Sequence, residues 1–382
     1  MNRGLRRFVA PFANVAALIA ICALMIGFNS PAQSMDLNQT LRQSWRFYQQ
    51  RFMPGGERVE SNNYGGSITE GQSYALMKAV WMGDRPAFDA AWRWTRRNMA
   101  RPDSVLPGWR WGKRDDGHYG LIASENATDA DQDIAYALLL AFERWGDAAY
   151  RTDADAMIAE LWQRHVHRIA GRYYLDPGDW PPFVEGEALT INPSYMAPYV
   201  YRAFARYDAA HADGWRALAN DVYPALEACS ALSALKLPPN WCAVNYQSGA
   251  IGFSDVQGEG ARDFGYDAFR VFWRMAMDAR EEGGSAQARA YLAAHDGLWR
   301  HWLAHRDLPE GFGPKGEPRN SGPSGFSRSA LFARQAALDP ARGQALYQAI
   351  LGPLYHPEGY WQNDYNDFMH SVVWLHVWTA RP

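Results

Sequence analysis

The stretch that decides the fold is residues 127–145, which read ATDADQDIAYALLLAFERW. Apolar side chains recur at helical spacing through it, and this pattern predicts a helix over residues 131–145. Three aspartates, Asp129, Asp131 and Asp133, stand at the start. One or two of them can simply cap the helix or complement its dipole. Three crowded carboxylates also repel one another, and this raises the pKa of at least one nearby group.

Eleven further stretches show the same helical spacing. They are residues 37–52, 70–82, 85–99, 147–169, 193–208, 211–232, 264–279, 285–304, 324–337, 340–351 and 364–378. Twelve helices can pair as six hairpins, and hairpins that close in a ring present their long loops at its ends, where they form a cleft. An open solenoid is the alternative, although the sequence has no fixed-period repeat to support it. Since no linker divides residues 35–382, we expect one domain there.

The first 34 residues have the pattern of a secretory signal peptide. Three arginines precede an apolar run over residues 15–28, and Ala32-Gln33-Ser34 follows it. The run is shorter than the roughly 18–20 residues that a membrane span needs. We therefore expect cleavage after Ser34 and a periplasmic or secreted protein without stable membrane insertion; a permanent anchor is the alternative.

The net charge limits the classes of molecule that the protein can bind, and the cysteines bear on disulfides and metal sites. The net charge is −3 for the whole chain, and it becomes −6 without residues 1–34, which hold three arginines and no acid. Nucleic acid is therefore an unsuitable partner, and an uncharged substrate fits better. Cys229 and Cys242 would form one disulfide in an oxidising compartment, or remain two buried thiols. No CxxC or HExxH motif occurs, and we expect neither a metal nor a cofactor.

Glu70 is the first residue of the helix predicted at 70–82 and lies within the sequence GGSITEGQSY of residues 65–74. Together with Ser67 it fits the S-x-x-E capping box, in which the carboxylate only satisfies a backbone N–H. Gly71 favours a functional interpretation, because glycine is a poor helix former and lets a ligand approach closely. The spacing alone leaves both interpretations open.

Asp267 lies near the start of the predicted helix at 264–279, with Arg270 three residues later on the same face. The pair can be an exposed ion pair within one helix. Alternatively, Arg270 and the helix N-terminus hold Asp267 ionised, which suits it to activate a water as general base. Glycoside hydrolysis requires one protonated and one ionised carboxyl. The crowded aspartates favour a protonated carboxyl nearby, and Arg270 favours an ionised Asp267.

Aromatic residues are abundant, with 17 Trp and 20 Tyr in 382 residues. Several fall in or beside the long loops, where rings can stack on sugar faces, although any single ring is more often part of a core. The candidates for substrate binding are Trp109, Trp111, Tyr195 and Tyr266, together with Arg270.

These motifs resemble glycoside hydrolase family 8, and within it the endo-β-1,4-glucanases associated with bacterial cellulose synthesis. The most specific match is the run ATDAD-x-x-IA-x-ALL-x-A-x-x-x-W over residues 127–145, and weaker ones are TEGQSY at 69–74, NPSY at 192–195 and YDA-x-R at 266–270. The resemblance implies an all-α (α/α)6 toroid that inverts the anomeric centre without a metal. It implies Glu70 as general acid, Asp267 as general base, Asp129 as the residue that binds and distorts the sugar, and Tyr195 as a residue that holds the water.

The leading hypothesis is an endo-acting hydrolase of β-1,4-glucan that works beside a cellulose synthase complex during polymer export. Xylan and chitosan are alternative substrates, because the motifs are shared across the family. A polysaccharide lyase or uronide hydrolase would need a basic cleft, which the scattered arginines do not favour. A non-catalytic glucan-binding protein, in which the acids only cap helices, is the alternative from a different class.

Overall fold

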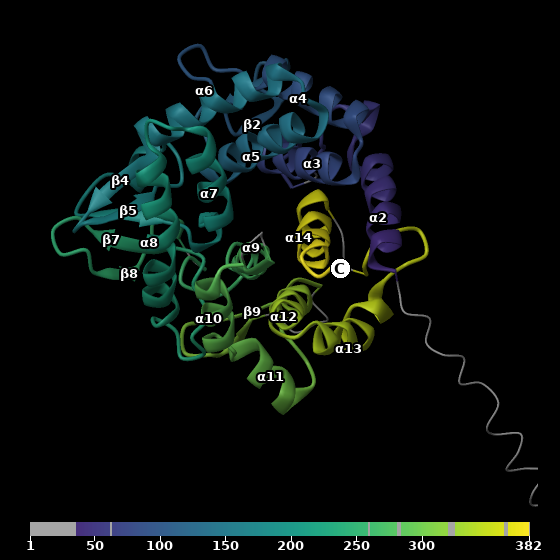
Figure 1. The fold of residues 1–382 in the computed structure, drawn as a ribbon, viewed down its shortest axis with the longest axis vertical. Helices are drawn as coiled ribbons and strands as arrows, with labels where there is room; N and C mark the ends of the chain where they lie inside the picture. The colour runs from purple at the N-terminus through teal and green to yellow at the C-terminus, as the bar shows by residue number, and fades with distance from the viewer. Residues whose placement is uncertain are drawn as a thin grey trace, which may run out of the picture.

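Six helices line the inside of a ring (Figure 1). They are α3 (Thr69–Met82), α5 (Thr128–Trp145), α7 (Pro198–Tyr207), α9 (Arg270–Arg280), α12 (Gly325–Leu338) and α14 (Asp367–Trp378). In α5 every residue from Thr128 to Leu139 is buried, which is why its sequence is apolar on more than one face. This computed structural model describes residues 36–61, 63–258, 260–280, 284–319, 325–362 and 366–381. The predicted signal peptide at 1–34 lies outside them.

Six more helices form an outer layer around the first, in alternation along the chain (Figure 1). They are α2 (Leu37–Phe52), α4 (Arg85–Asn98), α6 (Ala148–His165), α8 (Ala212–Ser230), α10 (Ala286–Ala294) and α13 (Pro340–Ile350). These helices are amphipathic: α4 buries Phe88, Ala91, Trp92 and Thr95 and exposes the opposite stripe. Inner and outer helices alternate around a closed ring, and the predicted (α/α)6 fold is confirmed.

Several predicted helix bounds differ from the structure. The helix expected at 285–304 is two helices, α10 and the peripheral α11 (Gly297–His305), separated by His295 and Asp296. The helix expected at 147–169 ends at His165, because the β-branched residues that follow belong to a strand. The helices expected at 193 and 264 begin later, at Pro198 and Arg270.

Short antiparallel strands in the loops form small sheets beside the helices. One sheet joins β1 (Gly66–Ile68), β2 (Arg110–Lys113) and β3 (Tyr119–Ala123), and another joins β6 (Ala188–Ile191), β7 (Cys242–Asn245) and β8 (Ile251–Phe253). Two-stranded sheets pair β4 (Val166–Ile169) with β5 (Arg172–Leu175), and β9 (Gly311–Phe312) with β10 (Pro318–Arg319). Because β1 leads directly into α3, the first sheet fixes the start of that helix.

The inner helices bring their N-terminal ends to one end of the ring. Arg270 at the start of α9 contacts Glu70 at the start of α3 and Asp129 in the first turn of α5. The start of α14 is close by, since a Cβ placed on Gly71 would lie 3.0 Å from Asp367 Oδ2. Helix N-termini carry a partial positive charge, so this end of the ring favours carboxylates.

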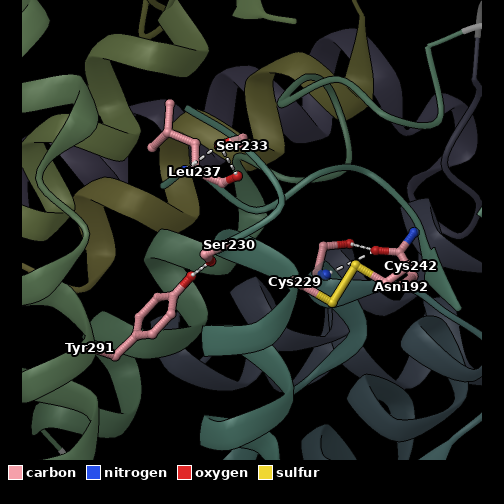
Figure 2. The surroundings of a disulfide bond; sticks show 8 residues. Asn192, Cys229, Ser230, Ser233, Leu237, Cys242 and Tyr291 are labelled. Carbon is pink, nitrogen blue, oxygen red and sulfur yellow. Dashed lines mark hydrogen bonds between the residues drawn. A yellow bond between two sulfur atoms is a disulfide. The ribbon is translucent and has the colours of Figure 1, made fainter. Parts of the chain in front are cut away.

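A disulfide joins Cys229 near the end of α8 to Cys242 at the start of β7, with their Cα atoms 6.2 Å apart (Figure 2). Of the two possibilities that the sequence left open, the structure has the bonded pair. The bond holds the segment containing Trp241 against α8. None of the described helices is both long enough and apolar enough to cross a membrane.

Candidate active site

Arg270 is the centre of the candidate site, and its side chain is only 2% exposed. Its Nη1 donates hydrogen bonds to Glu70 Oε1 and to Asp129 Oδ2, the latter at 2.8 Å. Its Nη2 donates to Asp267 Oδ1 at 2.6 Å. The structure thus brings together the three carboxylates that the sequence predicted as catalytic. A buried guanidinium needs such partners, because an unpaired buried charge is strongly destabilising.

Ser67 and Glu70 do not form a capping box, so that interpretation, one of the two that the sequence left open, is wrong. Ser67 lies in strand β1, where its Oγ donates to the Val59 carbonyl at 2.6 Å. Helix α3 instead starts after Ile68, which has no capping side chain. The Glu70 carboxyl accepts a hydrogen bond from Tyr74 Oη at 3.0 Å and a second from Arg270.

Burial raises the pKa of Glu70 from 4.5 to about 8. The positive charge of Arg270 opposes this rise, while the negative charges of Asp129 and Asp267 add to it. A carboxyl with this pKa carries a proton at neutral pH. In the described part of the chain, the hydrogen bonds to its side chain both end on Oε1. The other oxygen, Oε2, is therefore the atom suited to hold the proton.

Asp267 lies in the turn before α9, three residues ahead of the first helical residue. Arg270 is buried, so the interpretation of the two residues as an exposed intrahelical ion pair is wrong. Burial raises the pKa of Asp267, and the neighbouring Arg270 and Trp241 lower it without cancelling that rise. Arg270 lowers the pKa of Asp267 as expected, but the rise caused by desolvation is larger. The Asp267 side chain is 31% exposed, and water can reach it.

The three aspartates at the start of α5 have different partners. Asp129 accepts from its own helix at Ala130 N and from Arg270, so it alone of the three contacts the guanidinium at the centre. Asp131 accepts from Asn126 Nδ2 at 2.7 Å, and burial raises its pKa. Asp133 binds both Nη atoms of Arg274, one turn below Arg270 on α9. Asp129 therefore contacts the central residue of the candidate site, whereas Asp133 joins α5 to α9.

Of the predicted aromatic residues, three have contacts near the carboxylates, and the fourth, Trp111, packs elsewhere. Tyr195 lies beside the guanidinium, with Arg270 Cζ 5.5 Å from its ring centroid. Tyr266 is 49% exposed next to Asp267, and the Trp109 carbonyl accepts from Thr69 N at the start of α3. The ring of Trp111 instead stacks on Tyr119 and packs its edge against a tryptophan of α4. No described contact joins Trp111 to the carboxylates.

A cleft of about 910 Å³ opens beside Asp267. Its walls are the loop before α9 and the β9–β10 hairpin, with Trp241, Tyr266, Asp267 and Glu310 among the lining residues. Glu70, Asp129 and Trp109 do not line it. The cleft therefore approaches the carboxylate cluster from the side of Asp267.

Tyr74 is a site residue that the sequence analysis missed. It lies four residues after Glu70, and residues at this spacing share one helix face, so the spacing could have identified it.

Within the described ranges, no group of three His, Cys, Asp or Glu side chains is placed to hold a metal ion.

Comparison with known proteins identifies the family of this chain. The sequence profile of the glycosyl hydrolases family 8 matches residues 17–314. The chain belongs to glycoside hydrolase family 8. An endoglucanase of Pseudomonas fluorescens is 32% identical over 348 residues, which cover 86% of this chain and 82% of that protein.

Solved structures of family 8 enzymes have the same fold. The crystal structure of a family 8 endoglucanase from Klebsiella pneumoniae superposes with a TM-score of 0.68 at 27% identity, covering 88% of this chain and 98% of that one. A cold-adapted family 8 xylanase superposes with a TM-score of 0.72 at 18% identity, covering 94% and 93%. The second likeness concerns the fold alone, and it means that the fold does not decide the substrate.

Proposed function

We propose that this family 8 glycoside hydrolase cleaves β-1,4-glucan chains internally, by an inverting mechanism with Glu70 as acid and Asp267 as base. The observation that carries the proposal is the set of three carboxylates on Arg270, one of which has a pKa of about 8. The endoglucanases among its relatives support the substrate class.

The acid step uses Glu70. Its Oε1 is held by Tyr74 and Arg270, which fixes the carboxyl and directs the protonated Oε2 toward the glycosidic oxygen. Transfer of that proton lets the leaving sugar depart as an alcohol. As the proton leaves, Glu70 becomes a carboxylate beside a guanidinium, and Arg270 stabilises the charge that develops.

The base step uses Asp267. Its Oδ1 is occupied by Arg270 Nη2, which favours the ionised form and leaves the carboxylate able to take a proton from water. Its position on the cleft wall supports this role, because the attacking water arrives on the face of the sugar opposite to the acid. We assign to Tyr195 the holding of that water, and to Asp129 the binding of the sugar at the cleavage point.

Sugar rings on either side of the cleavage point are assigned to aromatic side chains. The proposed contacts are those of Trp109, Trp111, Tyr195 and Tyr266, with Arg270 as the polar contact at the centre.

Release of reducing ends from soluble carboxymethylcellulose tests the proposal. The purified protein is compared on carboxymethylcellulose, xylan, chitosan and a polyuronate at equal mass concentration. We expect the highest rate on carboxymethylcellulose, with a rapid fall in viscosity that marks internal cleavage. A higher rate on xylan or chitosan would reassign the substrate, and no hydrolysis together with measurable glucan binding would favour a non-catalytic role.

We also propose that the enzyme is exported and acts beside cellulose synthesis, with residues 35–382 as one catalytic domain. The support is the apolar run at 15–28 followed by Ala32-Gln33-Ser34. N-terminal sequencing of exported protein should start at Met35. Full-length chain in the inner membrane would contradict the cleavage, and unchanged cellulose yield in a strain lacking the gene would contradict the link to synthesis.

A further inference from the structure

Tyr64 is an exposed aromatic side chain close to the start of the Glu70 helix, and no sequence motif includes it. Its side chain is 40% exposed, comparable to the 49% of Tyr266 beside Asp267. The two tyrosines precede the acid and the base in the chain by six residues and one residue. Each therefore lies close in the chain to one of the two carboxyls.

The Tyr64 ring is held by its neighbours. The turn closes through Tyr64 N and Gly65 N, which both donate to the Ser61 carbonyl, and Gly65 has the positive φ of 64° that such a turn needs. Arg110 Nη2 donates to the Tyr64 carbonyl at 3.0 Å. The ring packs edge-to-face on Trp109, with centroids 5.6 Å apart. A ring fixed in this way loses little conformational entropy when it binds a ligand.

Contacts of Trp109 place the Tyr64 ring near Glu70: the ring packs on Trp109, and the Trp109 carbonyl accepts from Thr69 N, the residue before Glu70. The pKa of the Tyr64 hydroxyl is raised by partial burial and then by the negative charges of Glu70 and Asp267, while Arg110 and Arg270 oppose that rise. This direction of the pKa shift agrees with the position that the Trp109 contact gives the ring. Arg110 Cζ lies 5.7 Å from the ring centroid, and the ring surface that Trp109 and Arg110 leave free is exposed to solvent.

The hydroxyl group of Tyr64 has no hydrogen-bond partner in the described part of the chain, although the ring beneath it is fixed. A phenol can donate one hydrogen bond and accept others, and its ring offers an apolar face. A pyranose presents the matching surfaces, with hydroxyls around the edge and C–H groups on the face. We propose that Tyr64 is a substrate-binding residue that contacts the glycan chain on the Glu70 side of the cleavage point.

This inference rests on the proposed glucanase function, and the variants Tyr64→Phe and Tyr64→Ala test it. Tyr207→Phe is the matched control, because Tyr207 lies at the C-terminal end of α7, where its hydroxyl bonds Glu143 away from the carboxylates. kcat and KM are measured on a cello-oligosaccharide. The dissociation constant is measured by calorimetry in a Glu70→Gln background, where substrate is not consumed.

Loss of the hydroxyl in Tyr64→Phe should weaken binding by about 3-fold to 10-fold, the value of a hydrogen bond. Tyr64→Ala should weaken it further, and Tyr207→Phe should leave it unchanged. The change should appear mainly in KM, with the melting temperature of Tyr64→Phe at the wild-type value. If Tyr64→Ala does not fold, Tyr64→Phe decides.

Two outcomes separate this inference from the function on which it rests. An active wild-type enzyme whose Tyr64 variants bind and turn over the cello-oligosaccharide normally would overturn the role of Tyr64 alone. A wild-type enzyme that neither binds nor cleaves it would overturn the proposed function and this inference with it.

Discussion

Replacing Glu70 with Gln should greatly slow catalysis while stabilising the protein at alkaline pH. Glutamine keeps an oxygen that accepts from Tyr74 and Arg270, but it has no proton to give. Activity should fall by about 10²-fold to 10⁴-fold, the contribution of a general acid. In the wild-type enzyme the same carboxyl should set the alkaline limb of the kcat/KM profile, with activity lost above about pH 8.

The stability effect follows from proton linkage. Glu70 has a pKa of about 8 in the folded protein and near 4.5 when unfolded, so between these pH values the folded state holds a proton that the unfolded state has released. Stability conferred by this group therefore falls as pH rises from about 4.5 to about 8. At 1.36 kcal/mol per pKa unit the loss is at most about 5 kcal/mol. Solvent at the 19% exposed side chain reduces it.

Thermal unfolding of wild type and Glu70→Gln at pH 5 and pH 9 tests this reasoning. The two proteins should have similar melting temperatures at pH 5, where the wild-type carboxyl is protonated in the folded state. At pH 9 the variant should melt several degrees higher, because it carries no buried charge to neutralise. Equal melting temperatures at both pH values would refute the raised pKa. Near-normal activity of the variant would refute the assignment of Glu70 as acid.

Two further predictions concern Arg270 and the disulfide. Arg270→Ala removes the cation that lowers the pKa of Asp267, so the acidic limb of the kcat/KM profile should move up by about 1 pH unit or more. Arg270→Lys, which keeps a positive charge, should move it less, and a limb that stays in place in both variants would contradict the contact. Replacing both Cys229 and Cys242 with Ser opens a link between residues 13 apart and should cost about 3 kcal/mol in denaturant unfolding. KM should rise as well, since Trp241 in the cleft wall adjoins Cys242. Unchanged stability and KM would show that the disulfide contributes neither to stability nor to substrate binding.

The helical layers of the fold could be predicted from the sequence, because the inner helices have apolar runs of helical length and the outer helices have an amphipathic period. The run at 127–145 and the outer helix at 85–98 illustrate this. The strands could not be predicted, since strands of two to five residues such as β1 and β9 are too short to show alternation. The break between α10 and α11 lies at the turn dipeptide Asp296-Gly297, a local signal that the continuous helical spacing assigned to 285–304 did not take into account.

The site was predictable where side chains fall in recognisable motifs. Glu70, Asp129, Asp267 and Arg270 were identified in this way, and the structure places each of the three carboxylates in contact with Arg270. The pKa of Asp267 was not predictable, because the sequence shows the neighbouring charge but not the burial that outweighs it. Tyr64, which we propose as a substrate contact, falls in no motif for a related reason: its position depends on a turn and on Trp109, 45 residues away.

The stereochemistry of the first product tests the central claim most directly. If Asp267 activates a water, its carboxyl should lie about 6.5–9.5 Å from that of Glu70 in the substrate complex, whereas a nucleophile would require about 5–5.5 Å. Proton NMR of a cello-oligosaccharide during the first turnovers resolves the two anomers before they interconvert. Initial formation of the α-anomer from the β-linked substrate is the result that the account predicts. Initial formation of the β-anomer would contradict the assignment of Asp267 as general base.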